Sequence, residues 1–119
     1  MVKGLRNEAI QEQKVYLLHF DIGSNRVWID SDAMTEEECE LAREKAFELP
    51  QDVRVLDVWS REKGKKAVDK AVIRFSQKGY VEQTLIHLGA EDGREFTLVL
   101  NPFLVRIKIY DKYVDIGTI

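Results

Sequence analysis

The chain has 119 residues, of which 45% are hydrophobic, so we expect a single domain spanning residues 1–119 with a modest core. Its 18 Lys and Arg residues and 21 Asp and Glu residues give a net charge of −3, whereas dedicated nucleic-acid binders usually present a strongly basic face. The lone cysteine, Cys39, excludes an internal disulfide. No stretch of about 18 consecutive apolar residues occurs, so we expect no α-helical membrane span within this sequence.

Residues 2–13, VKGLRNEAIQEQ, contain mostly good helix formers after the glycine, and their apolar residues recur at helical spacing. Because so short a helix is marginally stable alone in water, its narrow apolar stripe must pack on something. We therefore assign residues 1–13 to the end of an N-terminal helix. Its packing or assembly surface would consist of Val2, Leu5, Ala9 and Ile10.

From Lys14 the apolar pattern alternates with a period of two, which is typical of a β-strand. Both faces of this first strand are largely apolar, so we expect it to be covered on both sides. Residues 23–25, Gly-Ser-Asn, form a turn signal, and residues 26–30 return as a second strand. The pattern predicts a β-hairpin over residues 14–30.

The next segment begins with an acidic stretch that favours a helix start. Thr35 and Glu38 have the spacing of a capping box, and the glutamates between them suit the positive end of a helix. Cys39, Ala42, Ala46 and Leu49 form an apolar stripe, and Pro50 ends the pattern. We predict a helix over residues 35–49.

After Pro50 the sequence is almost entirely of β type. Regular alternation in the first of these strands places Val53, Val55 and Trp59 on one face and Leu56 and Val58 on the other. Turn signals recur every eight to twelve residues, including the hairpin cue of residues 92–93, Asp-Gly. We therefore predict a five-strand antiparallel meander over residues 52–116, and an α+β fold in which β-structure dominates.

Few residues offer catalytic or metal-binding chemistry. His19 and His87, the only histidines, each fall within a predicted strand, and we interpret both as partly buried, hydrogen-bonded strand residues. No cluster with metal-ligand spacing surrounds either histidine. Cys39 follows three glutamates, which raise rather than lower a thiol pKa, so we interpret it as a small apolar helix residue.

Two charged segments invite a binding interpretation. The acidic run lacks the pattern of a calcium loop, and a solvated helix start explains it; it comprises Asp30, Asp32, Glu36, Glu37, Glu38 and Glu40. The basic turn would contact an acidic partner or simply form a hairpin tip that discourages edge pairing; it comprises Arg61, Lys63, Lys65 and Lys66. No phosphate loop or nucleophile motif is present. We therefore expect no catalytic, cofactor-binding or metal-binding residues, and a function carried out by surfaces.

Several short segments, taken in order, resemble the head of GspH/FimT-type pseudopilins and minor pilins. The run RNEAI at residues 6–10 resembles the end of the long N-terminal helix of that family, which a hairpin follows at once. LPQDVRV (49–55) is similar to its Leu-Pro-x-x-Val segment, and IRFSQKGY (73–80) to its Phe-x-x-x-Gly strand and turn. REFTLVLNPFLVRIKI (94–109) resembles its closing hairpin.

This resemblance implies a pilin-like fold, in which the N-terminal helix packs on antiparallel sheets and a short acidic helix follows the first hairpin. It also implies a longer native chain, with a helix anchored in the bacterial inner membrane and its head in the periplasm. Its partners would be other pseudopilins or pilins of one filament, with no nucleic acid, cofactor or small-molecule substrate. The implied function is that of a minor pseudopilin of type II secretion, which helps to export folded proteins.

Three alternatives stay open at the level of sequence. The first is a minor pilin that helps to start a type IV pilus, since the resemblance covers both systems. The second is a free-standing β-rich module that binds a partner across a sheet face or edge. A small enzyme would require His19 or His87 to meet carboxylates in a pocket.

Overall fold

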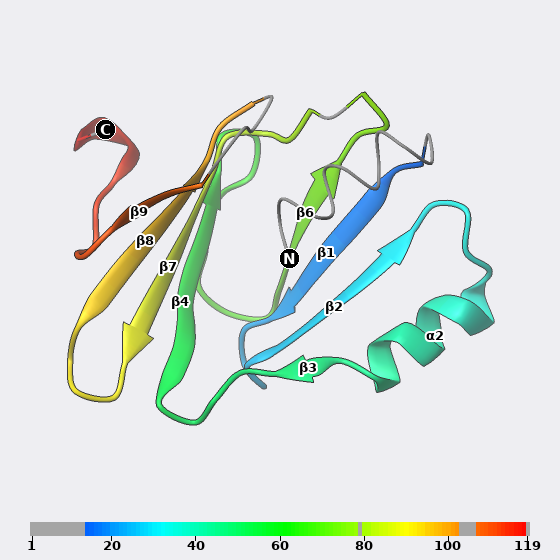
Figure 1. Cartoon of the computed structure of the whole chain (residues 1–119), viewed down its shortest axis with the longest axis horizontal. Helices are drawn as coiled ribbons and strands as arrows, with labels where there is room; N and C mark the ends of the chain where they lie inside the picture. Colours follow the sequence, from blue (N-terminus) through cyan, green and yellow to red (C-terminus); the bar gives the residue numbers. More distant parts are fainter. Residues whose placement is uncertain (1–13, 79, 103–106, 119) are drawn as a thin grey trace.

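The computed structural model describes residues 14–78, 80–102 and 107–118. Over these residues the chain forms two antiparallel sheets, one α-helix and a short 3-10 helix, η1 (Ile116–Thr118). Figure 1 shows the two sheets side by side, with the helix at the far edge of one of them. The described part is therefore a two-layer β-structure with little helix.

The first sheet, which we call sheet A, has the order β3-β2-β1-β6. It consists of β1 (Tyr16–Asp21), β2 (Arg26–Ser31), β3 (Phe47–Glu48) and β6 (Lys70–Phe75). β1 and β2 form an antiparallel hairpin in the segment where alternation predicts one, and Leu18 lies opposite Ile29. β6 pairs with the other edge of β1, so that β1 is a central strand.

The second sheet, sheet B, has the order β5-β4-β7-β8-β9. It consists of β4 (Val53–Ser60), β5 (Gly64–Lys66), β7 (Thr84–Ala90), β8 (Glu95–Leu100) and β9 (Lys108–Tyr110). The prediction of a simple meander after Pro50 is wrong, because β6 leaves this sheet and joins sheet A. Strand pairing in space, which a single sequence does not reveal, decides this crossover.

The core lies between the two sheets. It consists of side chains that face inward from both sheets, and these side chains are almost inaccessible to solvent. Sheet A contributes Tyr16, Leu18, Phe20, Val27, Ala71, Ile73 and Phe75, and sheet B contributes Val55, Val58, Ile86 and Leu100. Burial of these side chains is the main source of stability, at about 1.5–3 kcal/mol for each large one.

A β-bulge in β4 changes which residues face this core. The register against β7 shifts between Val55 and Asp57, so that Leu56 is the extra residue. Val55 and Val58 both face the core as a result, whereas Asp57 and Trp59 face outward. The predicted grouping of Trp59 with Val55 is wrong for this reason, because regular alternation does not anticipate a bulge.

The outer face of sheet B is also buried. Leu85 and Val99 are neighbours across β7 and β8, point away from the main core and are fully inaccessible. The segment after β9 contributes to this outer layer, because its Val114 is buried and hydrogen-bonds to both β7 and β8. Figure 1 shows the chain running from β9 to the C-terminus beside sheet B.

The helix α2 (Glu36–Glu44) connects β2 to β3. Thr35 caps it: its hydroxyl accepts a hydrogen bond from Glu38 N–H, and Glu38 accepts one from Thr35 N–H, which together form a capping box. The helix is shorter than the predicted 35–49, because Phe47 and Glu48 pair with Val27 and Arg26 as β3. The edge of sheet A offers these residues backbone partners, and this outweighs their helical spacing.

The expected α+β, pilin-like fold class is wrong. The residues that the structure describes are mostly β, with two antiparallel sheets, and no N-terminal helix packed on the sheets is among them. The predicted helix over residues 1–13, with its surface of Val2, Leu5, Ala9 and Ile10, lies outside the described residues. The α+β class followed from the two predicted helices, and its pilin-like form followed from the family resemblance. The period-two alternation of the chain correctly indicated the dominance of strands.

Neither helix in the described part of the chain has the length and apolar character needed to cross a lipid bilayer.

Candidate functional site

A cluster of hydrogen-bonded polar side chains lies on the outer face of sheet B, around His87 on β7. Its Nδ1 lies 2.5 Å from Oδ1 of Asp57, which the bulge in β4 turns toward it. The Tyr113 hydroxyl donates to Oδ2 of Asp57 at 2.6 Å, and the Tyr113 ring stacks on the imidazole at 3.7 Å between centroids. His87 Nε2 lies 2.7 Å from the carbonyl oxygen of Val114.

These contacts account for both ring nitrogens of His87. The Val114 carbonyl can only accept, so Nε2 of His87 carries a hydrogen. Nδ1 of His87 forms its hydrogen bond with Oδ1 of Asp57. Oδ2 of Asp57 accepts from the Tyr113 hydroxyl, so both oxygens of this carboxyl group have hydrogen-bond partners. Both ring nitrogens of His87 are therefore engaged within the protein.

Lys65 extends the network to the surface. Its ammonium lies 5.5 Å from the centre of the Tyr113 ring, and the interaction with the Tyr113 hydroxyl raises the pKa of Lys65. Partial burial raises the pKa of Tyr113, and the hydrogen bond to Asp57 raises it further. Tyr113 therefore stays neutral near pH 7 and keeps its donor for Asp57.

Thr97 on β8 fastens the same C-terminal segment. Its hydroxyl donates to the Lys112 carbonyl at 2.8 Å and accepts from Val114 N–H at 3.0 Å. Thr97 is fully buried, and the His87 side chain is only 1% exposed. The polar side-chain atoms of His87, Asp57 and Thr97 all form hydrogen bonds within the protein. This cluster therefore holds the C-terminal segment on sheet B rather than facing a substrate.

A second pair of a histidine and an aspartate lies on the outer face of sheet A. His19 Nε2 is 2.9 Å from Oδ1 of Asp30, and the His19 ring stacks on Trp28 with 5.1 Å between centroids. The Arg43 guanidinium of α2 lies 5.7 Å from the Trp28 ring centre. The pair thus helps to seat α2 against β2, and the His19 side chain is 20% exposed.

Cys39 on α2 lies next to this pair but does not form a reactive site with it. Desolvation raises the thiol pKa, and the neighbouring Asp30 carboxylate raises it further. A raised pKa lowers the thiolate fraction at neutral pH, which is the opposite of an activated nucleophile. The structure therefore places Cys39 where the sequence predicts, on a helix with acidic neighbours.

The acidic run does not form a metal site. Asp30 binds His19, Asp32 accepts from Val15 N–H, and Glu38 belongs to the helix cap. Within the described residues, no group of three or more His, Cys, Asp or Glu side chains is arranged to hold a metal ion. The remaining glutamates of the run lie exposed on α2.

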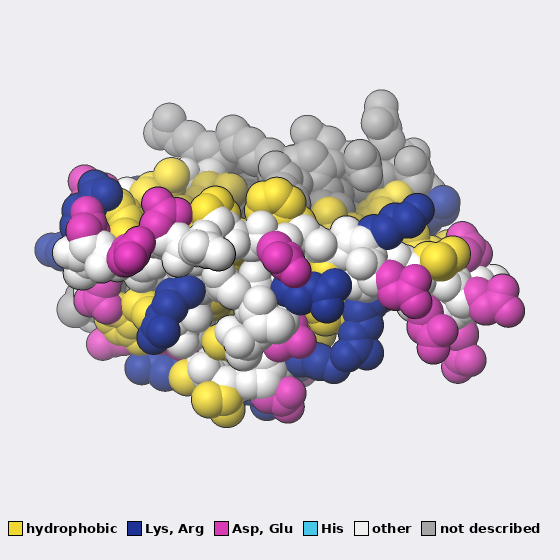
Figure 2. Space-filling view, turned by 90° about the horizontal axis from the view of Figure 1, so that it is seen from below, with side chains coloured by type: hydrophobic (Ala, Val, Ile, Leu, Met, Phe, Trp, Pro, Cys, Tyr) yellow, Lys and Arg dark blue, Asp and Glu magenta, His cyan; other side chains and the backbone are white. Residues whose placement is uncertain are grey.

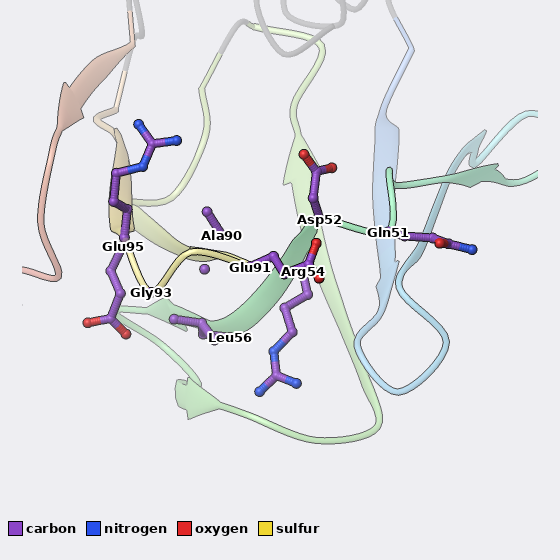
Figure 3. Close-up of a pocket in the computed structure, with 10 residues that line it drawn as sticks. Gln51, Asp52, Arg54, Leu56, Ala90, Glu91, Gly93 and Glu95 are labelled. Carbon is purple, nitrogen blue, oxygen red and sulfur yellow. The ribbon is translucent and has the colours of Figure 1, made fainter.

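The open cavities lie elsewhere. A shallow cavity of about 440 Å³ lies at one end of sheet B. Figure 3 shows its lining side chains coming from the start of β4 and from the β7–β8 hairpin. The lining carries both charges, with Arg54 and Arg94 beside Asp52, Glu91 and Glu95. Mixed charge around a shallow opening suits contact with another protein better than the enclosure of a small molecule.

Sequence reasoning found both histidines but missed their partners. Asp57 and Tyr113 lie 30 and 26 residues from His87 along the chain, and the bulge reverses the face on which alternation places Asp57. One signal was available: an aspartate within an otherwise apolar strand is seldom buried without a partner.

Comparison with protein-family models, with curated proteins and with solved structures gave no match.

Proposed function

We propose that this chain is a non-enzymatic assembly subunit, a minor pseudopilin of a type II secretion pseudopilus. In this role it contributes to the export of folded proteins across the outer membrane. Its partners are other pseudopilins of the same filament. The native protein is anchored in the bacterial inner membrane by a helix preceding the head, and the head lies in the periplasm. The ordered segments of the sequence that resemble pseudopilin heads support this proposal.

The observation that carries the proposal is the position of β1, the first described strand after the run at residues 6–10. β1 begins at Tyr16, six residues after Ile10, and is a central strand of sheet A. It pairs with β2 on one side and β6 on the other, through six residue pairs each. A strand held on both sides resists being pulled out, so it is a suitable attachment point for a head that is anchored through its N-terminal segment.

The state of the polar groups also supports a role without chemistry in the head. His87 and Asp57 are buried and hold the C-terminal segment, and His19 and Asp30 help to seat α2. Neither histidine lines any of the open cavities that we identify in the described residues. The features that remain available to partners are the exposed edges, turns and shallow cavities.

Deletion of the gene in the source bacterium tests the proposal. We expect proteins that are normally secreted to accumulate folded in the periplasm, and a plasmid copy to restore their export. Loss of surface pili with normal secretion would replace this role with that of a type IV minor pilin. Normal secretion together with normal pili would overturn both roles.

A further inference from the structure

A second cavity, of about 370 Å³, opens where the edges of the two sheets approach each other. It lies between β5 at the edge of sheet B and β6 at the edge of sheet A. We call it the lysine slot; its principal lining residues are Lys63, Lys66 and Lys70 at the rim and Val58, Ala71 and Ile73 at the floor. An apolar floor with a charged rim is the arrangement of a protein-docking site.

The charge of the slot is one-sided. Among the described residues that line it, the three lysines are the only charged side chains. None of these lysines forms an ion pair with a carboxylate of the described chain. Residues 61–74 hold six basic and two acidic side chains in a chain whose net charge is −3. The slot is thus a local positive feature that suits an acidic occupant.

α2 offers a surface of opposite character. Leu41 is 52% exposed, and no residue of this helix is buried. Glu37 and Glu44 stand four residues before and three residues after Leu41, so all three lie on one face of the helix, with Glu40 adjacent. Figure 2 shows acidic side chains gathered at the end of the molecule where α2 lies. The helix therefore presents an apolar knob surrounded by carboxylates.

The two surfaces lie on opposite edges of sheet A. α2 packs beside β2 near the β3 edge, whereas the slot borders β6 at the other edge. Figure 1 shows α2 and β6 on opposite sides of β1 and β2. Two surfaces that face away from each other cannot meet within one molecule. They can meet between copies, head to tail, in a heterologous contact that each added copy can repeat.

We infer that the lysine slot is a docking site for the acidic face of α2 of a second copy of this chain. Leu41 of one copy lies over the apolar floor of the other, and the glutamates around it meet the lysine rim. The inference rests on the proposed function, because a filament holds the heads of its subunits close to one another. The contact is weak between free heads and becomes effective when the subunits are held side by side.

Complementary variants test this docking directly. In the slot variant, Lys66→Glu and Lys70→Glu reverse the rim and leave α2 unchanged. In the helix variant, Leu41→Ala and Glu37→Lys remove the knob and leave the slot unchanged. We would add the unlabelled slot variant to the ¹⁵N-labelled helix variant at low salt and record amide shifts. We expect shifts confined to the labelled slot, around Lys63–Ile73, and saturating as one copy binds one copy.

Each variant alone should show no concentration-dependent shifts, because each lacks one half of the contact. Wild type should show them at both the slot and α2, with binding about fivefold weaker after a single rim reversal. Raising the salt from about 50 to about 500 mM should weaken the binding further. The matched control is the double reversal Lys78→Glu and Lys108→Glu, which makes the same charge change outside the slot and should behave as wild type.

Several outcomes would overturn the inference. They are the absence of shifts in the mixture, equal concentration-dependent shifts in the control and in the slot variant when each is measured alone, and slot shifts with inorganic phosphate that match those with the protein. The proposed function is judged separately, by secretion in the deletion strain. Failed docking with a clear secretion defect removes only the slot contact, whereas normal secretion with intact docking removes only the secretion role.

Discussion

At the scale of single residues, the Asp57–His87 pair is the most consequential contact on the outer face of sheet B. Both side chains are buried, and together they connect β4, β7 and the C-terminal segment. Removing one member of a buried, hydrogen-bonded pair leaves the other without compensation, which typically costs about 3–5 kcal/mol. We expect Asp57→Ala to lower the free energy of unfolding by about that amount in urea titrations.

The double variant Asp57→Ala with His87→Ala is the matched control, because it removes both members. It should be less destabilised than the sum of the two single variants, by about 0.5–3 kcal/mol of coupling. Strict additivity would show that the two residues do not act as a pair.

Tyr113 offers a smaller test of the same cluster. Tyr113→Phe keeps the ring that stacks on His87 and removes the donor to Asp57. A hydrogen bond to a charged group is worth about 1.5–3 kcal/mol, so we expect a loss of that order in chemical denaturation. Tyr110→Phe on the edge strand β9 makes the same chemical change, and its effect should stay within about 0.5 kcal/mol. Equal effects of the two variants would contradict the assigned role of Tyr113.

At the scale of elements, the β7–β8 hairpin depends on the backbone of Gly93. Its φ is +92°, in a region that L-residues rarely adopt, and no atom lies within 4 Å of an added Cβ. Gly93→Ala should therefore destabilise through the backbone alone, by about 1–2 kcal/mol in thermal unfolding. Gly117→Ala adds the same methyl group at a position with open space and no positive φ, and should have little effect. A melt of Gly93→Ala that equals wild type would contradict this.

α2 depends on its cap rather than on burial, since none of its residues is buried. Thr35→Ala should weaken the helix by about 1 kcal/mol. We expect faster hydrogen exchange at the amides of α2, with the amides of β1 and β7 unchanged, because the helix lies at the edge of the fold. Uniformly faster exchange across both sheets would mean instead that α2 is essential to the core.

The elements also show how far the sequence alone could lead. Alternation located the first hairpin, and the Thr35–Glu38 capping box marked the start of α2. The sequence places the end of α2 too late, because it does not reveal that β3 pairs with the first residues of β2. The outward position of Asp57 was missed because one bulge residue, Leu56, shifts the alternation of β4. Both errors arise from strand pairing, which depends on contacts that are remote in sequence.

At the scale of the whole molecule, the described part of the chain combines a body of two sheets with surfaces of opposite charge at the two edges of sheet A. The acidic α2 lies near the β3 edge and the lysine slot lies at the β6 edge. The tightly held C-terminal segment and the central β1 give the body firm connections at both ends of the described chain. These features suit a subunit that acts by position and contact, which is the central claim of the proposed function.

The most direct test of that claim is intact-mass and N-terminal analysis of the native protein, isolated from the membrane fraction of its source cells. The proposal predicts a mature chain with about 25–30 further residues before Leu5, mostly apolar and long enough to enter the bilayer, with a methylated N-terminus. A native protein that begins at Met1 and is absent from the membrane fraction would contradict it. The chain would then be a free-standing β-rich module, and its partners would have to be sought on that basis.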